Sequence, residues 1–175
     1  MHARCIVVMG VSGCGKSTVG AALAQSLGCA YVEGDDFHPP DTVARMAAGT
    51  PLTDAARAGW LQALAAQLRQ ATAAGQSIVM SCSALKRRYR DALRGGAPDL
   101  VFVHLAGSAE LLAHRTADRV HRYMPASLLR SQLDTLEPPQ ADEASITVDV
   151  ALPVERIVEE VRVRLESRVG PAGAS

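Results

Sequence analysis

The chain has 175 residues, of which 48% are hydrophobic and only 3% aromatic, and its 18 Lys and Arg balance its 18 Asp and Glu. This length favours one domain, and the zero net charge removes the global field that would draw a protein to nucleic acid or to a membrane surface. No apolar run approaches the roughly 20 residues that span a bilayer and no segment resembles a signal peptide, so we expect neither a nucleic-acid partner nor a membrane partner.

Strand-like and helical stretches alternate along the chain, a pattern typical of an α/β fold with a parallel sheet. The short apolar runs predict strands at 5–9, 30–33, 77–82, 100–105 and 145–150. The stretches between them predict helices at 16–27, 40–48, 54–74, 85–94, 109–118, 126–136 and 154–166. Gly28, Gly75, Gly95 and Gly96 stand where helices are expected to end. We therefore expect one domain over residues 1–168, with helices flanking a five-stranded parallel sheet, and a disordered tail of small residues at 169–175.

Residues 10–17 read GVSGCGKS and match the phosphate-binding motif G-x-x-x-x-G-K-[ST] between a predicted strand and a predicted helix. In this motif the glycines let backbone N–H groups curl around a phosphate, and the helix N-terminus adds the positive end of its dipole. Lys16 would neutralise the β- and γ-phosphates, and Ser17 would bind Mg²⁺. The predicted nucleotide contacts in this loop are Gly10, Val11, Ser12, Gly13, Cys14, Gly15, Lys16, Ser17 and Thr18. The motif predicts a P-loop NTPase-type three-layer sandwich that binds ATP with Mg²⁺.

Acidic residues follow the second predicted strand, at the edge where open parallel sheets bind their ligands. Asp35 is the candidate for orienting an acceptor hydroxyl and taking its proton, and Asp36 competes for this role. Glu33 either holds a Mg²⁺-bound water or is a surface charge. His38 either donates a hydrogen bond to the acceptor or has a local backbone partner. The pattern predicts phosphoryl transfer to a hydroxyl at this edge of the sheet.

Cationic residues gather further along the chain. Arg45, Arg57 and Lys86 would converge on an anionic acceptor, although each of them alone is typical of a solvated surface. Arg115 and Arg119 are four residues apart and therefore share one helix face. A basic segment that closes over the phosphates would exclude water and stabilise the transferring charge, so we expect a lid at about 115–137.

The four cysteines, Cys5, Cys14, Cys29 and Cys82, form no C-x-x-C pair and no metal-ligand spacing. We expect four free thiols in a reducing compartment. Cys14 lies in the phosphate loop, where it is either an oxidation-prone thiol of lowered pKa or simply a small residue.

Several longer strings resemble the gluconate kinase family, small P-loop kinases related to shikimate and adenylate kinases. They are MGVSGCGKST at 9–18, EGDDFHP at 33–39, MAAGTPLTD at 46–54, WL at 60–61, SALKRRYR at 83–90 and SQLDTLEPP at 131–139. The resemblance implies ATP- and Mg²⁺-dependent phosphorylation of D-gluconate to 6-phospho-D-gluconate by a cytoplasmic homodimer. It also adds Ser83 and Arg90 to the candidate substrate contacts and places residues 150–153 against the adenine.

On this interpretation Lys16, Asp35 and Arg119 are the catalytic residues. The predicted substrate contacts are Asp35, His38, Arg45, Arg57, Ser83, Lys86 and Arg90. The chain departs from the family's pattern at Thr42, Arg45 and Ala56, in the segment expected to cover the acceptor, and at Arg122 in the lid. These departures leave open a kinase of another small hydroxy acid, and a nucleotide-binding module without turnover is the alternative from a different class.

Overall fold

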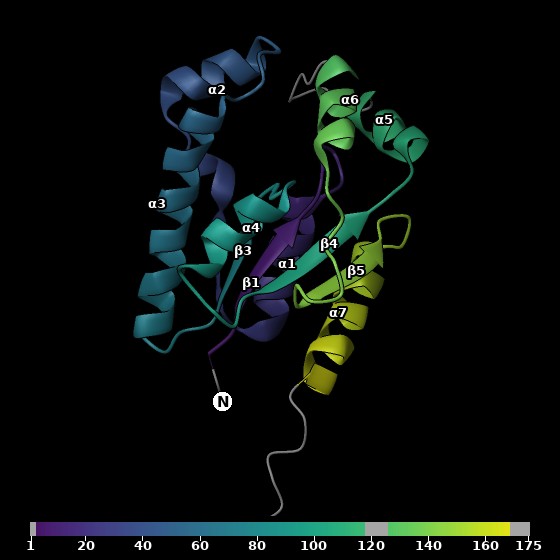
Figure 1. Ribbon diagram of the computed structural model, residues 1–175. Helices are drawn as coiled ribbons and strands as arrows, with labels where there is room; N and C mark the ends of the chain where they lie inside the picture. The colour runs from purple at the N-terminus through teal and green to yellow at the C-terminus, as the bar shows by residue number, and fades with distance from the viewer. Residues whose placement is uncertain (1–2, 118–125, 169–175) are drawn as a thin grey trace, which may run out of the picture.

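The computed structural model describes residues 3–117 and 126–168. Five strands form one parallel sheet in the order β2-β3-β1-β4-β5 (Figure 1). They are β1 (Cys5–Met9), β2 (Ala30–Glu33), β3 (Ile78–Ser81), β4 (Val101–Ala106) and β5 (Ser145–Asp149). The predicted five-stranded parallel sheet is confirmed, with strand ends within one residue of the predicted ones. The predicted tail at 169–175 lies outside the described residues.

Seven α-helices connect and follow the strands within the described ranges. They are α1 (Lys16–Leu27), α2 (Pro40–Ala47), α3 (Asp54–Ala73), α4 (Arg87–Arg94), α5 (Ala109–Ala117), α6 (Ala126–Thr135) and α7 (Val154–Arg168). Gly28 and Gly75 end their helices in the left-handed conformation, with φ of 67° and 64°. The sequence missed a short 3₁₀ helix, η1 (Gly34–Phe37), and placed the start of α4 two residues too early, because Lys86 is extended.

Two apolar cores lie on opposite faces of the sheet. Ile6 and Val8 of β1 face a core shared with α1 and α7, whereas Val7 and Met9 face a core shared with α3 and α4. Successive side chains of a strand point to opposite faces, so a strand covered on both sides is apolar throughout. All five residues of β1 are buried, and β1 is the central strand.

The carboxyl ends of the strands all point to one edge of the sheet, and two helical segments stand beyond that edge (Figure 1). One is α2, which is joined to the top of α3, and the other is the pair α5 and α6, which pack against each other. The predicted lid at about 115–137 includes α6, while its residues 118–125 lie outside the described ranges. Among the described helices, none combines the length and the apolar character needed to cross a membrane.

The turn after α4 crosses α3 at very short range, and this contact gives a test of the packing. A Cβ atom at Gly96 would lie 2.2 Å from the carbonyl oxygen of Ala65 in α3, so the two backbones would have to move apart. We expect Gly96→Ala to lower the free energy of unfolding by about 1–3 kcal/mol in chemical denaturation. Gly59→Ala is the control, because a Cβ there meets nothing within 4 Å and alanine favours the helix by up to about 1 kcal/mol. Equal stability of both variants would contradict the close approach.

Candidate active site

The loop between β1 and α1 has the backbone that its glycines predict. Gly10, Gly13 and Gly15 have φ of 147°, 81° and 93°, a range that L side chains rarely adopt. At Gly10 a Cβ would also lie 2.7 Å from Cys14 Sγ and 3.0 Å from the carbonyl oxygen of Leu105. Cys14 itself is buried beneath the loop, as the small-residue interpretation predicts, so its thiol does not face an incoming ligand. The loop is therefore a tight turn whose interior is filled by Cys14.

Polar groups of the phosphate loop already have partners inside the protein. Lys16 Nζ donates a hydrogen bond to the carbonyl oxygen of Val11 at 3.1 Å. The backbone N–H of Ser12 donates to Gln132 Oε1 at 2.6 Å, a contact that ties α6 to the loop. The backbone N–H of Gly10 donates to the carbonyl oxygen of Ser83 at 3.3 Å and so joins the loops after β1 and β3. The sequence did not single out Gln132, although it lies in the string SQLDTLEPP.

The carboxylate of Glu33 at the end of β2 contacts the phosphate loop. Ser17 Oγ donates to Glu33 Oε2 at 2.5 Å, and the hydroxyls of Tyr31 and Ser81 donate to the two carboxylate oxygens, each at 2.7 Å. Burial pushes the pKa of Glu33 upward, but the hydrogen bonds from Ser17, Ser81 and Tyr31 outweigh it and hold this pKa below its ordinary value. Of the two predicted interpretations, the structure favours a role in the site over a plain surface charge.

Asp35 in η1 and His38, the residue directly after η1, lie close together near the end of β2. The Asp35 side chain is 54% exposed, and its Oδ1 lies 3.8 Å from His38 Nε2. The imidazole is buried and stacks on Trp60 with ring centroids 4.1 Å apart, while Trp60 Nε1 donates to the carbonyl oxygen of Gly34 at 2.8 Å. Burial lowers the pKa of His38 and the charge of Arg57 lowers it further, against the opposing effect of Asp35. The structure therefore places a neutral imidazole next to an accessible carboxylate.

The Nδ1 atom of His38 lacks a hydrogen-bond partner among the described residues. This nitrogen atom is buried away from solvent. A buried polar atom without a partner costs free energy, and such groups in native structures commonly meet a ligand or a water. The predicted local backbone contact of the His38 ring is therefore not what the described residues show.

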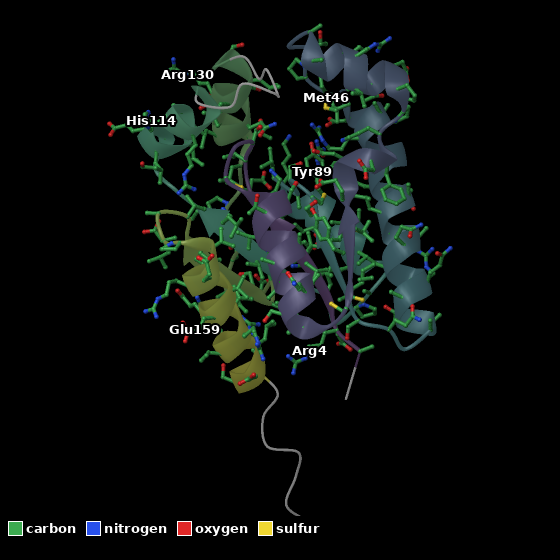
Figure 2. The ribbon with its side chains drawn as sticks, turned by 180° about the vertical axis from the view of Figure 1, so that it is seen from behind. Arg4, Met46, Tyr89, His114, Arg130 and Glu159 are labelled. Atoms are coloured by element: carbon green, nitrogen blue, oxygen red, sulfur yellow. The ribbon has the colours of Figure 1, made fainter. Side chains whose placement is uncertain are left out.

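A cluster of cations gathers around one aromatic ring. Arg57 Nη1 donates to Tyr89 Oη at 2.9 Å, and the Arg57 guanidinium lies 4.7 Å from the centroid of the Tyr89 ring. Lys86 Nζ lies 5.9 Å from the same centroid. Figure 2 shows Tyr89 near the centre of the molecule, below Met46 of α2 on one side and Arg130 of α6 on the other. Tyr89 lies within the string SALKRRYR, but the sequence pattern predicted no role for it.

The thiol of Cys82, the residue directly after β3, is buried close to several of the predicted site residues. Burial raises the pKa of Cys82 to about 12, and the charges of Asp35, Lys16 and Arg57 also act on this thiol. These three residues come from η1, the start of α1 and α3. Trp60 of α3 donates to the carbonyl oxygen of Gly34 in η1, and Ser17 of α1 donates to Glu33 directly before η1, so the three elements meet here. The structure thus brings together the phosphate-loop lysine, the predicted base and one predicted acceptor contact.

Other predicted site residues lie at the margin of this group. Arg45 is exposed in the last turn of α2, and Thr42 of the same helix is buried. Arg115 Nη2 donates to the carbonyl oxygen of Val150 at 2.6 Å, so helix α5 contacts the segment that was predicted to face the adenine. Arg119 lies outside the described residues.

Arg90 is not brought to the surface of the site. Its side chain is completely buried, with Nε 2.7 Å and Nη2 3.1 Å from the carboxylate oxygens of Glu143. Its Nη1 donates to the carbonyl oxygens of Ala84 and Leu85 at 2.8 and 3.3 Å. Ala84 has a φ of 45°, a strained value for a residue other than glycine. Arg90 therefore braces the loop that carries Ser83 and Lys86, and its Nε, Nη1 and Nη2 atoms each donate to a partner inside the protein.

The Arg90–Glu143 pair predicts how stability depends on pH. Burial raises the pKa of Glu143, but hydrogen bonds from Arg90 and from the backbone of Gln140 outweigh burial and lower it to about 2. A lowered carboxyl pKa contributes stability above the ordinary Glu value, and this contribution is lost as the pH falls from about 4.3 toward 2. We expect Glu143→Gln to cost about 3–5 kcal/mol of unfolding free energy at pH 7, because it leaves a buried cation without its counter-charge.

The difference between this variant and the wild type should shrink below about pH 4, as the wild-type carboxyl also becomes neutral. Denaturant titrations from pH 7 to pH 2.5 measure it. Asp142→Asn is the control, because Asp142 pairs with Arg87 at the surface, where such a pair contributes about 0–1 kcal/mol. A pH-independent difference for Glu143→Gln would contradict the ionised pair.

Known proteins resemble the chain over nearly its full length. The model of the AAA domain family matches residues 5–139. A gluconokinase of Gluconobacter oxydans (strain 621H) is 49% identical over 158 residues, which cover 90% of this chain and 89% of that one. The crystal structure of a gluconokinase from Sinorhizobium meliloti 1021 is 45% identical with a TM-score of 0.84, covering 95% of this chain and 97% of that one. An unliganded sugar kinase from Janibacter sp. HTCC2649 is 44% identical with a TM-score of 0.90, covering 99% of both chains.

Proposed function

The chain belongs to the gluconokinase family, and we propose on this premise that it transfers the γ-phosphoryl group of ATP to D-gluconate, giving 6-phospho-D-gluconate. One observation carries the proposal. A phosphate loop with its lysine, an accessible carboxylate and a cation cluster lie at one edge of the sheet, where Ser17 contacts Glu33, close in sequence to Asp35, and the loop after β3 carries Lys86. These are the groups that phosphoryl transfer to the hydroxyl of a sugar acid needs.

The residues of the phosphate loop fit a Mg²⁺-nucleotide. The glycines of the loop adopt the positive φ values that such a turn needs, and Lys16 and Ser17 stand at the start of α1, where a helix N-terminus favours an anion. Among the described residues no three His, Cys, Asp or Glu side chains form a metal cage, and Mg²⁺ commonly takes only one or two protein ligands beside phosphates and water. Ser17 would hold the ion, which when bound offsets the negative charge of the phosphates.

The side chains of this protein supply the rest of the reaction. Lys16 Nζ would leave the carbonyl oxygen of Val11 and pair with the β- and γ-phosphates. An Oδ atom of Asp35 would accept the proton of the gluconate hydroxyl as the new P–O bond forms. His38 Nδ1 would hydrogen-bond another hydroxyl of the substrate, which would satisfy its buried polar atom.

The carboxylate of the sugar acid would be held by the cation cluster. Arg57 and Lys86 lie around the Tyr89 ring, and Arg offers two parallel hydrogen bonds to a carboxylate. Ser83 lies on the same loop as Lys86, and Arg90 braces that loop from inside. Arg45 would add a further charge from α2, and Arg115 and Arg119 would close over the phosphates from the lid.

Family membership is also the ground on which we place this enzyme in the cytoplasm as a homodimer. The four cysteines are free thiols, which agrees with a reducing compartment. The size of the protein in solution, measured by light scattering, tests the dimer.

The two neighbouring aspartates provide the sharpest test of the proposed base. We expect Asp35→Asn to lower kcat for gluconate by about 10²- to 10⁴-fold, since an amide accepts no proton, and Asp36→Asn to leave it within a few-fold of wild type. Formation of 6-phosphogluconate is followed through its dehydrogenase, with ATP and Mg²⁺ supplied. The reverse pattern would move the base to Asp36. Activity of the wild type on a different sugar acid only would show that Thr42, Arg45 and Ala56 have changed the acceptor.

Tyr89 gives a separate prediction for substrate binding. Tyr89→Phe keeps the ring but removes the hydroxyl that orients Arg57 at 2.9 Å. We expect KM for gluconate to rise about tenfold with little change in kcat or in KM for ATP, because a hydrogen bond to a charged group is worth about 1.5–3 kcal/mol. Arg156→Gln is the control, since Arg156 is exposed on α7 and pairs with Glu159. An unchanged KM for gluconate in Tyr89→Phe would remove Arg57 from the acceptor site.

A further inference from the structure

Three hydroxyl groups from three different elements hold the carboxylate of Glu33. Ser17 Oγ comes from α1, Tyr31 Oη from β2 and Ser81 Oγ from the end of β3. Tyr31 Oη also lies 2.9 Å from Ser81 Oγ, so the single O–H of the phenol is shared between the carboxylate and this second hydroxyl. Among the described residues no Lys or Arg forms an ion pair with Glu33, so neutral donors alone hold this carboxylate.

A glycine inside α1 makes room for the phenol ring. A Cβ at Gly20 would lie 2.7 Å from Tyr31 Cε2, so any other residue there would push the ring away. Glycine within a helix costs about 1 kcal/mol relative to alanine, and here its use has a packing reason. Burial raises the pKa of Tyr31 to about 12, so the phenol remains a donor at neutral pH.

The hydrogen bond from Ser17 to Glu33 links the position of this carboxylate to metal binding. A serine that binds a cation through an oxygen lone pair has to donate its hydroxyl proton elsewhere, and Glu33 Oε2 accepts that proton here. Groups that hold the direct ligands of a metal commonly change its affinity by 10- to 100-fold when they are removed. A Glu33 side chain released by Tyr31 would be free to turn away from Ser17.

We propose that Tyr31 is a positioning residue of the magnesium–nucleotide site, which fixes Glu33 against Ser17 and depends on Gly20 for its own placement. This inference rests on the proposed function in taking Ser17 as a Mg²⁺ ligand. Tyr31 acts through Glu33, to which its hydroxyl donates a hydrogen bond. Its loss therefore affects the binding of Mg²⁺ together with nucleotide, and not the binding of nucleotide alone.

Calorimetric titration with ADP separates these two effects without any turnover. We expect Tyr31→Phe to raise the Mg²⁺ concentration for half-maximal tightening of ADP binding by about tenfold. The Kd for ADP in EDTA should stay within twofold of wild type. Gly20→Ala touches no polar group but displaces the Tyr31 ring, so it should raise the Mg²⁺ requirement in the same direction.

The combined variant and a matched control complete the experiment. Gly20→Ala with Tyr31→Phe should require no more Mg²⁺ than Tyr31→Phe alone, because both changes break the same contact. Gly59→Ala, a helix glycine in open space, should leave the Mg²⁺ requirement unchanged. An unchanged Mg²⁺ requirement in Tyr31→Phe, or an equal weakening of ADP binding in EDTA, would overturn the inference. If the wild-type protein bound ADP with the same affinity in Mg²⁺ and in EDTA, the proposed metal role of Ser17 would be overturned, and this inference with it.

Discussion

The parallel register of the three strands β2, β3 and β1 fixes the positions on which the whole site depends. Glu33 is paired with Ser81, and Ser81 is paired with Val8, so the three residues form one row across the sheet. Because the strands end at the same level, the phosphate loop, η1 and the loop after β3 all leave the sheet together. The approach is so close that a Cβ at Gly34 would lie 2.1 Å from the carbonyl oxygen of Ser81. A shift of one residue in this register would separate the carboxylate from its donors and turn every side chain to the wrong face.

Much of the fold was predictable because it follows from local pattern. β1 is a short run of apolar and mainly β-branched residues. Helix α1 begins at Lys16, as the phosphate-binding motif predicts, and ends before Gly28, as the glycine predicts. Helix η1 was missed because four residues, two of them acidic, show no helical periodicity. The start of α4 was misplaced because Ala84 adopts a φ of 45° and Lys86 is extended, and both conformations are held by contacts remote in sequence.

The charged residues of the site were predictable from the sequence, but the residues that hold them in place were less so. The phosphate loop and Asp35 stand in short motifs, whereas Tyr89 meets Arg57 across 32 residues and Gln132 meets Ser12 across 120. Arg90 shows the limit most clearly. It stands in a run of basic residues that looks uniformly exposed, and its burial depends on Glu143, which lies 53 residues further on. The helical spacing from Arg90 to the buried Leu93 was the one local signal that this arginine faces inward.

The hydrogen bond between the Ser12 N–H and Gln132 has a consequence for the end of the catalytic cycle. An anion that takes this N–H has to displace the Gln132 carbonyl, so its observed affinity is the difference between two competing contacts. The displaced side chain remains close by, because α6 is packed on α5 and its Leu129 is part of the core. An internal competitor at high local concentration weakens retention of the spent nucleotide. The contact between Ser12 and Gln132 therefore lowers the affinity of the loop for any phosphate group, that of the product included, and product release limits the turnover of many enzymes.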